Sequence, residues 1–85
     1  MANELLTNPD YDPNRLFDAV IARMNLKSDA RLARDMDIAP SCISAMRRKK
    51  RPVCAATLLR LHDLTGLPAY ELRNLMIRLP DVVVG

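Results

Sequence analysis

The amino-acid sequence predicts a compact all-α domain of five helices. Apolar residues recur at intervals of three and four along most of the chain, the spacing that places them on one face of a helix. Hydrophobic residues make up 49% of the 85 positions and only two residues are Gly, which is the composition of a folded domain. A chain of this length forms a single domain with a modest core.

The first expected helix spans residues 12–24. Asp12 suits the N-cap, and Pro13 suits the first helical position, where its missing N–H costs nothing. Asn25 tolerates the left-handed conformation that often follows a helix. The core-forming face of this helix consists of Leu16, Phe17, Val20, Ile21 and Met24. Residues 1–11 have no sustained period and contain an Asn-Pro turn signal, so we expect a flexible N-terminal arm there.

Two short helices joined by a tight corner are expected at residues 29–36 and 40–47. Ser28 precedes the first of them and suits its N-cap. The inward faces of the two helices are Leu32, Ala33 and Met36 in the first, and Ile43 and Met46 in the second. Two short amphipathic helices around a corner have the outline of a helix-turn-helix motif.

The outer face of the second short helix points to a nucleic acid. If Ile43 faces inward, the helical period turns Ser41, Ala45 and Arg48 outward, with Ser44 beside them. A short helix with small polar residues on its exposed side can enter a DNA groove. The run that follows this face is entirely basic and consists of Arg47, Arg48, Lys49, Lys50 and Arg51.

The last two helices are expected at residues 53–65 and 68–79. Pro52 separates the first of them from the basic run, and Gly66 ends it. Their inward faces are Leu58, Leu61 and Leu64, and Leu72, Leu75, Met76 and Leu79. Pro80 ends the last helix, which sets a domain of residues 12–79 and a tail of residues 80–85. The three valines of this tail pack on the domain or meet a second subunit.

Charge is distributed unevenly along the chain. Residues 1–22 carry four acidic residues and one Arg, a net charge of −3. Residues 23–51 carry nine basic residues and three Asp, a net charge of +6, and residues 52–85 carry three of each. The positive charge therefore coincides with the expected helix-turn-helix, as in a surface that meets a polyanion. The three aromatic residues are too few for a module that stacks single-stranded bases.

Residues with catalytic or metal-binding chemistry are sparse. Cys42 and Cys54 make neither a disulfide framework nor a zinc site with the single His62, so we expect two reduced thiols and no metal or cofactor. The chain shows no nucleophile–base set, paired-carboxylate pocket or Gly-rich phosphate loop, so we expect no enzymatic activity. With no signal peptide and no apolar run of about 18 residues, we expect a cytoplasmic protein without membrane contact.

Several short motifs, in this order and spacing, resemble the phage-repressor (Cro-like, or Xre) DNA-binding domains. They are Leu32-Ala33, Ile43-Ser44, Leu64-Thr65-Gly66-Leu67 and Glu71-Leu72, and the resemblance covers roughly residues 13–77. It implies a lambda-repressor-like fold in which the third helix lies in the major groove. The residues it places at DNA are Ser28, Asp29, Pro40, Ser41, Ser44, Ala45, Arg47, Arg48, Lys49, Lys50 and Arg51. The dimer interface it implies consists of Tyr70, Leu72, Leu75, Met76, Leu79, Val82 and Val83.

The sequence departs from the family pattern at the corner. Asp37 stands where Gly is usual, and Ala39 stands where a Ser or Thr cap is usual, a loss of about 1 kcal/mol. The serines of the third helix either read bases or bond to their own backbone, and Asp29 either opposes a phosphate or serves the helix dipole. The basic run either contacts phosphates or forms a solvated loop.

Two functions follow from these patterns. The first is a homodimeric, sequence-specific, double-stranded DNA-binding transcriptional regulator, a repressor by its resemblance, acting on a palindromic operator. The alternative is an antitoxin-like or adaptor module that binds a protein partner through its C-terminal helix. The two can coexist in one protein.

Overall fold

The computed structural model describes residues 11–77, and in this part of the chain all regular secondary structure is helical. Its five helices are α2 (Pro13–Arg23), α3 (Asp29–Met36), α4 (Pro40–Arg47), α5 (Ala55–Thr65) and α6 (Ala69–Met76). The prediction of an all-α domain with five helices is confirmed. The bounds of α3 and α4 agree with the prediction residue by residue.

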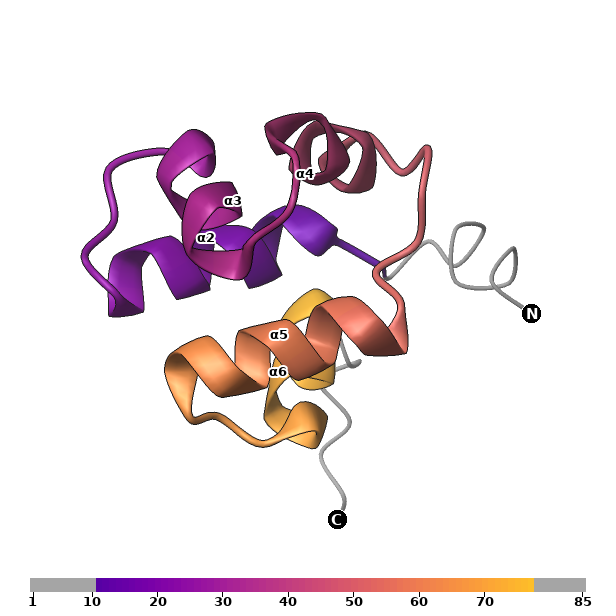
Figure 1. Cartoon of the computed structure of the whole chain (residues 1–85). Helices are drawn as coiled ribbons and strands as arrows, with labels where there is room; N and C mark the ends of the chain where they lie inside the picture. The colour runs from indigo at the N-terminus through magenta and orange to yellow at the C-terminus, as the bar shows by residue number, and fades with distance from the viewer. Residues whose placement is uncertain (1–10, 78–85) are drawn as a thin grey trace, which may run out of the picture.

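Helix α2 is the centre of the arrangement. It packs against each of the other four helices, while α3 pairs with α4 and α5 pairs with α6. In Figure 1 α4 lies above α2, α3 overlaps α2 in this view, and the α5–α6 pair lies below them. The chain crosses between the two pairs through residues 48–54, which contain most of the basic run.

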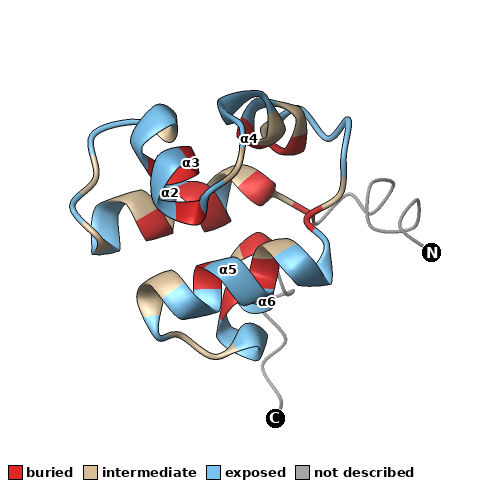
Figure 2. Cartoon of the chain, viewed as in Figure 1, coloured by how far each residue is buried: buried red, intermediate tan, exposed pale blue. Residues whose placement is uncertain are grey.

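The core lies where the helix pairs meet α2. Buried residues occupy the helix faces turned toward the middle of the molecule, and exposed residues occupy the outer faces (Figure 2). The apolar stripes predicted for α2, α3 and α4 supply much of this core. Its buried members are Tyr11, Leu16, Phe17, Val20, Leu32, Ala33, Met36, Ile43, Met46, Val53, Leu58, Leu61, Leu72 and Met76.

The predicted caps and stops are formed. The Asp12 carboxylate accepts a hydrogen bond from the Asn14 N–H at 3.1 Å, and the Ser28 hydroxyl accepts one from the Arg31 N–H at 3.2 Å. Each satisfies a backbone donor that the first helical turn leaves open. Gly66 ends α5 with a φ of 77°, a left-handed conformation that Gly adopts without steric cost.

Tyr11 belongs to the core, whereas the sequence placed it at the end of the arm. Its side chain is 0% exposed, and its hydroxyl accepts a hydrogen bond from the Val53 N–H at 3.2 Å. The next residue, Asp12, donates its N–H to the Met76 carbonyl at 2.6 Å. The segment before α2 therefore joins the α4–α5 connection to the end of α6.

Two helix ends differ from the prediction by more than one residue. Helix α5 begins at Ala55 instead of residue 53, because Val53 is buried in the extended connection and Cys54 takes the N-cap position. Helix α6 ends at Met76 because Ile77 is extended and forms an antiparallel bridge with Tyr11. The predicted end of this helix at residue 79 falls outside the described residues.

Candidate functional site

The corner between α3 and α4 is a three-residue turn with a left-handed residue at its start. Asp37 has φ 59° and ψ 45°. The Ile38 N–H donates to the Ala33 carbonyl at 2.9 Å, and the Asp37 N–H donates to the Arg34 carbonyl at 3.1 Å. These two bonds form a Schellman motif, which satisfies the last carbonyls of α3 and reverses the chain. Asp37 thus holds a backbone conformation that Gly adopts without steric cost.

Helix α4 has one buried face and one exposed face. Ile43 and Met46 are buried, while Ser41 and Ser44 are exposed. Arg48, the residue that follows the helix, is also exposed, Pro40 is exposed at its start, and Ala45 is half-buried. Ala39 makes no side-chain cap, as predicted. The outer surface of α4 is therefore small and polar along its length and ends in a cation.

The basic run continues from α4 as a second ordered turn. The Lys50 N–H donates to the Ala45 carbonyl at 2.9 Å and the Lys49 N–H donates to the Met46 carbonyl at 3.1 Å, with Lys49 left-handed at φ 61°. This is again a Schellman arrangement, so the start of the run is not a free loop. Among residues 11–77, the four exposed cations of this run have no carboxylate partner. They are Arg48, Lys49, Lys50 and Arg51.

Arg47 is different from the cations that follow it. Its Nε and Nη2 donate to the two carboxylate oxygens of Asp29, both at 2.9 Å, and Nη2 also donates to Asp18 at 2.9 Å. Its Nη1 donates to the side-chain oxygen of Asn14 at 2.8 Å, and the guanidinium lies 5.6 Å from the centre of the Phe17 ring. The side chain is only 19% exposed. The sequence grouped Arg47 with the phosphate contacts, and the structure instead uses its donors inside the fold.

Electrostatics hold this guanidinium in its charged form. Burial by itself would lower the pKa of Arg47, but the hydrogen bonds and the negative charges of Asp29 and Asp18 outweigh it and raise the pKa. One cation serves two carboxylates, so the group formed by Asp18, Asp29 and Arg47 keeps a net charge of −1.

The start of α3 therefore lacks the side-chain chemistry of a phosphate clamp. The Ser28 hydroxyl is occupied by its own helix, and both oxygens of Asp29 are bound by Arg47. A residual negative charge repels phosphate. Ser28 caps its own helix and Asp29 forms an ion pair with Arg47, and contact of either residue with DNA stays a prediction.

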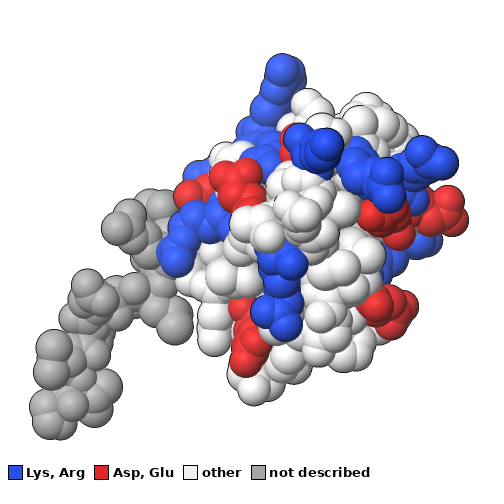
Figure 3. Space-filling view, turned by 90° about the vertical axis from the view of Figure 1, so that its left-hand side faces the viewer, with Lys and Arg blue, Asp and Glu red and all other residues white. Residues whose placement is uncertain are grey.

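The side of the molecule that carries the α2–α3 connection is mixed in charge. Figure 3 shows Lys and Arg side chains over the upper part of this side, with Asp and Glu side chains among them. One exposed ion pair on α3 joins Arg31 to Asp35 at 3.5 Å. The unpaired positive charge is therefore concentrated at the end of α4 more than on α3.

The predicted dimer surface is only partly exposed. Leu72 and Met76 are 0% and 2% exposed in the protein's own core, so neither is free to contact a second subunit. Tyr70 is 65% exposed, and Leu75 is half-buried. Leu79, Val82 and Val83 lie outside the described residues.

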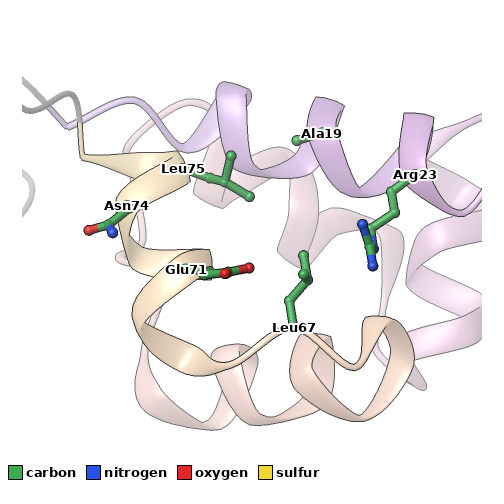
Figure 4. A pocket seen from close by; sticks show the side chains of 6 residues that line it. All are labelled: Ala19, Arg23, Leu67, Glu71, Asn74 and Leu75. Carbon is green, nitrogen blue, oxygen red and sulfur yellow. The ribbon is translucent and has the colours of Figure 1, made fainter.

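A shallow pocket of about 380 Å³ lies between α2 and α6, next to this surface. In Figure 4, Arg23 reaches into it from α2 and Glu71 reaches into it from α6. The rest of the lining consists of Ala19, Leu67 and Leu75, which are apolar, and Asn74. The pocket therefore combines charges of both signs with apolar side chains.

The residues with catalytic potential are dispersed. His62 is exposed and its Nδ1 lies 2.7 Å from the Leu67 carbonyl. Cys42 is half-buried and Cys54 is exposed, and both are free thiols. Within residues 11–77 no group of three or more His, Cys, Asp or Glu side chains is placed to hold a metal ion.

Comparisons with known protein families, with characterised proteins and with solved structures find no match to this chain. Within residues 11–77, no helix combines the length and the apolar character needed to span a membrane.

Proposed function

We propose that this protein is a sequence-specific, double-stranded DNA-binding transcriptional regulator. In this proposal the fold is a lambda-repressor-like helix-turn-helix domain of the phage-repressor type, with α4 as the recognition helix. The observation that carries the proposal is the exposed face of α4, on which Ser41, Ser44 and Arg48 stand over buried Ile43 and Met46. This face leads directly into three further exposed cations.

The dimensions of α4 suit the major groove. An α-helix with its side chains is about 10–12 Å across and the groove is about 12 Å wide. Small residues at the contact let the helix backbone come close to the base edges. Arg48 is suited to a bidentate contact with guanine, and Ser41 and Ser44 can donate to or accept from several bases.

The cations after α4 would contact phosphates. Lys49, Lys50 and Arg51 have no competing carboxylate within residues 11–77. Each phosphate that is neutralised adds about 0.9 to the slope of log affinity against log salt. Three contacts would therefore give a slope of about −2.7 for each subunit, in addition to any contribution from Arg48.

A homodimer would give the site enough length to be specific. One recognition helix reads only a few base pairs, while a two-fold dimer places two of them about 34 Å apart on a palindromic operator. The exposed part of α6, with Tyr70 and Leu75, and the neighbouring α2–α6 pocket are the surface we assign to the dimer. Occupying an operator blocks transcription without further chemistry, so repression is the simplest outcome.

The test is selection of bound fragments from a random duplex pool, followed by affinity measurements on the selected sequence. We expect a palindromic consensus and a loss of at least about tenfold in affinity for Arg48→Ala, the loss of one bidentate base contact. Arg34→Ala is the matched control, because it removes the same charge from an exposed position on α3 that belongs neither to the DNA-facing residues nor to the dimer surface. Failure to enrich any duplex, or equal losses in the two variants, would overturn the proposal.

The exposed aromatic on α6 supports a second candidate function. Tyr70 lies beside two shallow apolar surfaces, one of them lined by Tyr70 itself with Arg73, Asn74 and Ile77. An antitoxin-like or adaptor module would bind a protein partner there. Weak, sequence-independent DNA binding together with a tight protein complex that Tyr70→Ala abolishes would favour this function over the first.

A further inference from the structure

We propose that Arg47 is the positioning residue of the recognition helix and makes no DNA contact itself. This inference depends on the proposed DNA-binding function of α4. Its basis is the set of four side-chain hydrogen bonds that the Arg47 guanidinium makes to α2 and α3.

These bonds attach the end of α4 to two other helices at once. Asp29 begins α3, and Asn14 and Asp18 lie on α2. The Asn14 amide also donates to the Arg47 backbone carbonyl at 3.4 Å, so both the side chain and the main chain of Arg47 are held. A planar guanidinium bound on three sides restricts rotation about the helix axis and displacement of the helix end.

Apolar packing holds α4 through few side chains. The helix has eight residues, and Ile43 and Met46 are its two buried side chains. Arg47 lies one helical turn after Ile43 on the inward side. The next residue, Arg48, is turned about 100° further around the axis, toward the outer face. Holding Arg47 therefore sets the direction in which Arg48 leaves the helix.

The same bonds remove charge that would oppose DNA. Without Arg47, the carboxylates of Asp18 and Asp29 would be unpaired within residues 11–77 and close to the end of α4. Pairing leaves this region with a net charge of −1 instead of −2. Arg47 thus contributes to binding through geometry and charge compensation, while its own donors stay inside the protein.

Substitution of Asp29 distinguishes positioning from simple electrostatics. Asp29→Asn removes a negative charge near the DNA surface, so an account based on charge alone expects tighter binding. Positioning expects weaker binding to the selected consensus, by about tenfold, because the bidentate pair with Arg47 is lost. Asp35→Asn is the matched control: it removes the same charge from α3, and the partner of Asp35 is the exposed Arg31.

Substitution of Arg47 distinguishes positioning from a phosphate contact. If Arg47 contacted a phosphate, Arg47→Gln would reduce the magnitude of the salt slope by about 0.9. Arg47→Lys would restore the slope, because Lys also binds phosphate. A positioning residue leaves the slope unchanged, and Lys fails to restore specific affinity because it cannot reproduce the three-sided contact. Should Arg47 variants fail to fold, Asn14→Ala weakens the same contacts and leaves the charge intact.

The experiment measures binding of each folded variant to the consensus duplex and to a scrambled duplex over a range of salt concentrations, well below its melting temperature. We expect Asp29→Asn and Arg47→Lys to lose their preference for the consensus duplex while the salt slope stays unchanged. We expect Asp35→Asn to keep its preference for the consensus. This inference alone is overturned if Asp29→Asn binds as tightly as Asp35→Asn. It is also overturned if the salt slope changes in Arg47→Gln and is restored in Arg47→Lys. A natural-sequence protein that prefers no duplex overturns the proposed function and this inference with it.

Discussion

Asp37→Gly tests the physical account of the corner between α3 and α4. Asp37 has φ 59° and ψ 45° and is exposed, so the change touches the backbone and leaves the core intact. The left-handed conformation costs an L-residue about 1–2 kcal/mol, although Asp tolerates it better than most residues. Gly adopts it without that cost.

Two further contributions set the size of the effect. A negative charge at the C-terminal end of a helix opposes the helix dipole by about 0.3–1 kcal/mol, and Gly removes that charge. Against this, Gly gives the unfolded chain extra freedom, which costs about 0.5–1 kcal/mol. The net expectation is a gain of about 0.5–1.5 kcal/mol in the free energy of unfolding. For a domain of this size that raises the melting temperature by several degrees, at about 4–8 °C per kcal/mol.

Thermal melting followed by circular dichroism, together with urea unfolding, measures this change. Asp37→Asn is the control that separates the contributions, because Asn keeps the left-handed tolerance of Asp and removes only the charge. Asp37→Ala should be less stable than Asp37→Asn, since Ala removes the same charge but lacks the left-handed tolerance of Asn. A lower melting temperature for Asp37→Gly than for the natural sequence would refute the assignment of strain to this residue.

Two other predictions follow from side-chain contacts outside α4. Tyr11→Phe leaves the buried Val53 N–H without its acceptor, so we expect a loss of about 1–3 kcal/mol in stability, measured by urea unfolding; an unchanged midpoint would mean that this bond contributes nothing. Hydrogen bonds from Thr57 lower the pKa of the exposed Cys54 thiol, and therefore Cys54 should alkylate faster than half-buried Cys42 at neutral pH, as followed by mass spectrometry. Thr57→Val should raise that pKa and slow the reaction, and equal rates in the two proteins would contradict it.

The agreement between predicted and observed helices is best where local chemistry marks the ends. Ser28 and Asp37 delimit α3, and Pro40 begins α4, through interactions within a few residues of the chain. Agreement is worse at α5 and α6, where Val53 and Ile77 are extended because they meet Tyr11 from distant parts of the sequence. Helix propensity along the chain does not predict contacts between residues so far apart in the sequence.

The candidate site divides in the same way. The outward direction of Ser41 and Arg48 follows from the helical period, and the position of the basic run can be read directly from the sequence. The separate role of Arg47 cannot be read from the sequence, because its partners Asp29 and Asn14 lie 18 and 33 residues away. In the sequence, Arg47 and Arg48 are simply neighbouring cations.

The amino-acid sequence by itself determined the helical class, the α3–α4 unit and the segment that carries the positive charge, since periodicity, caps and composition are local properties. Only the tertiary structure decided which of those charges are available at the surface and which apolar residues of α6 are buried. Leu72 and Arg47 show the reason: a residue's exposure and ion pairing depend on what the fold brings next to it. The proposed role of Arg47 in orienting α4 follows from that second kind of information.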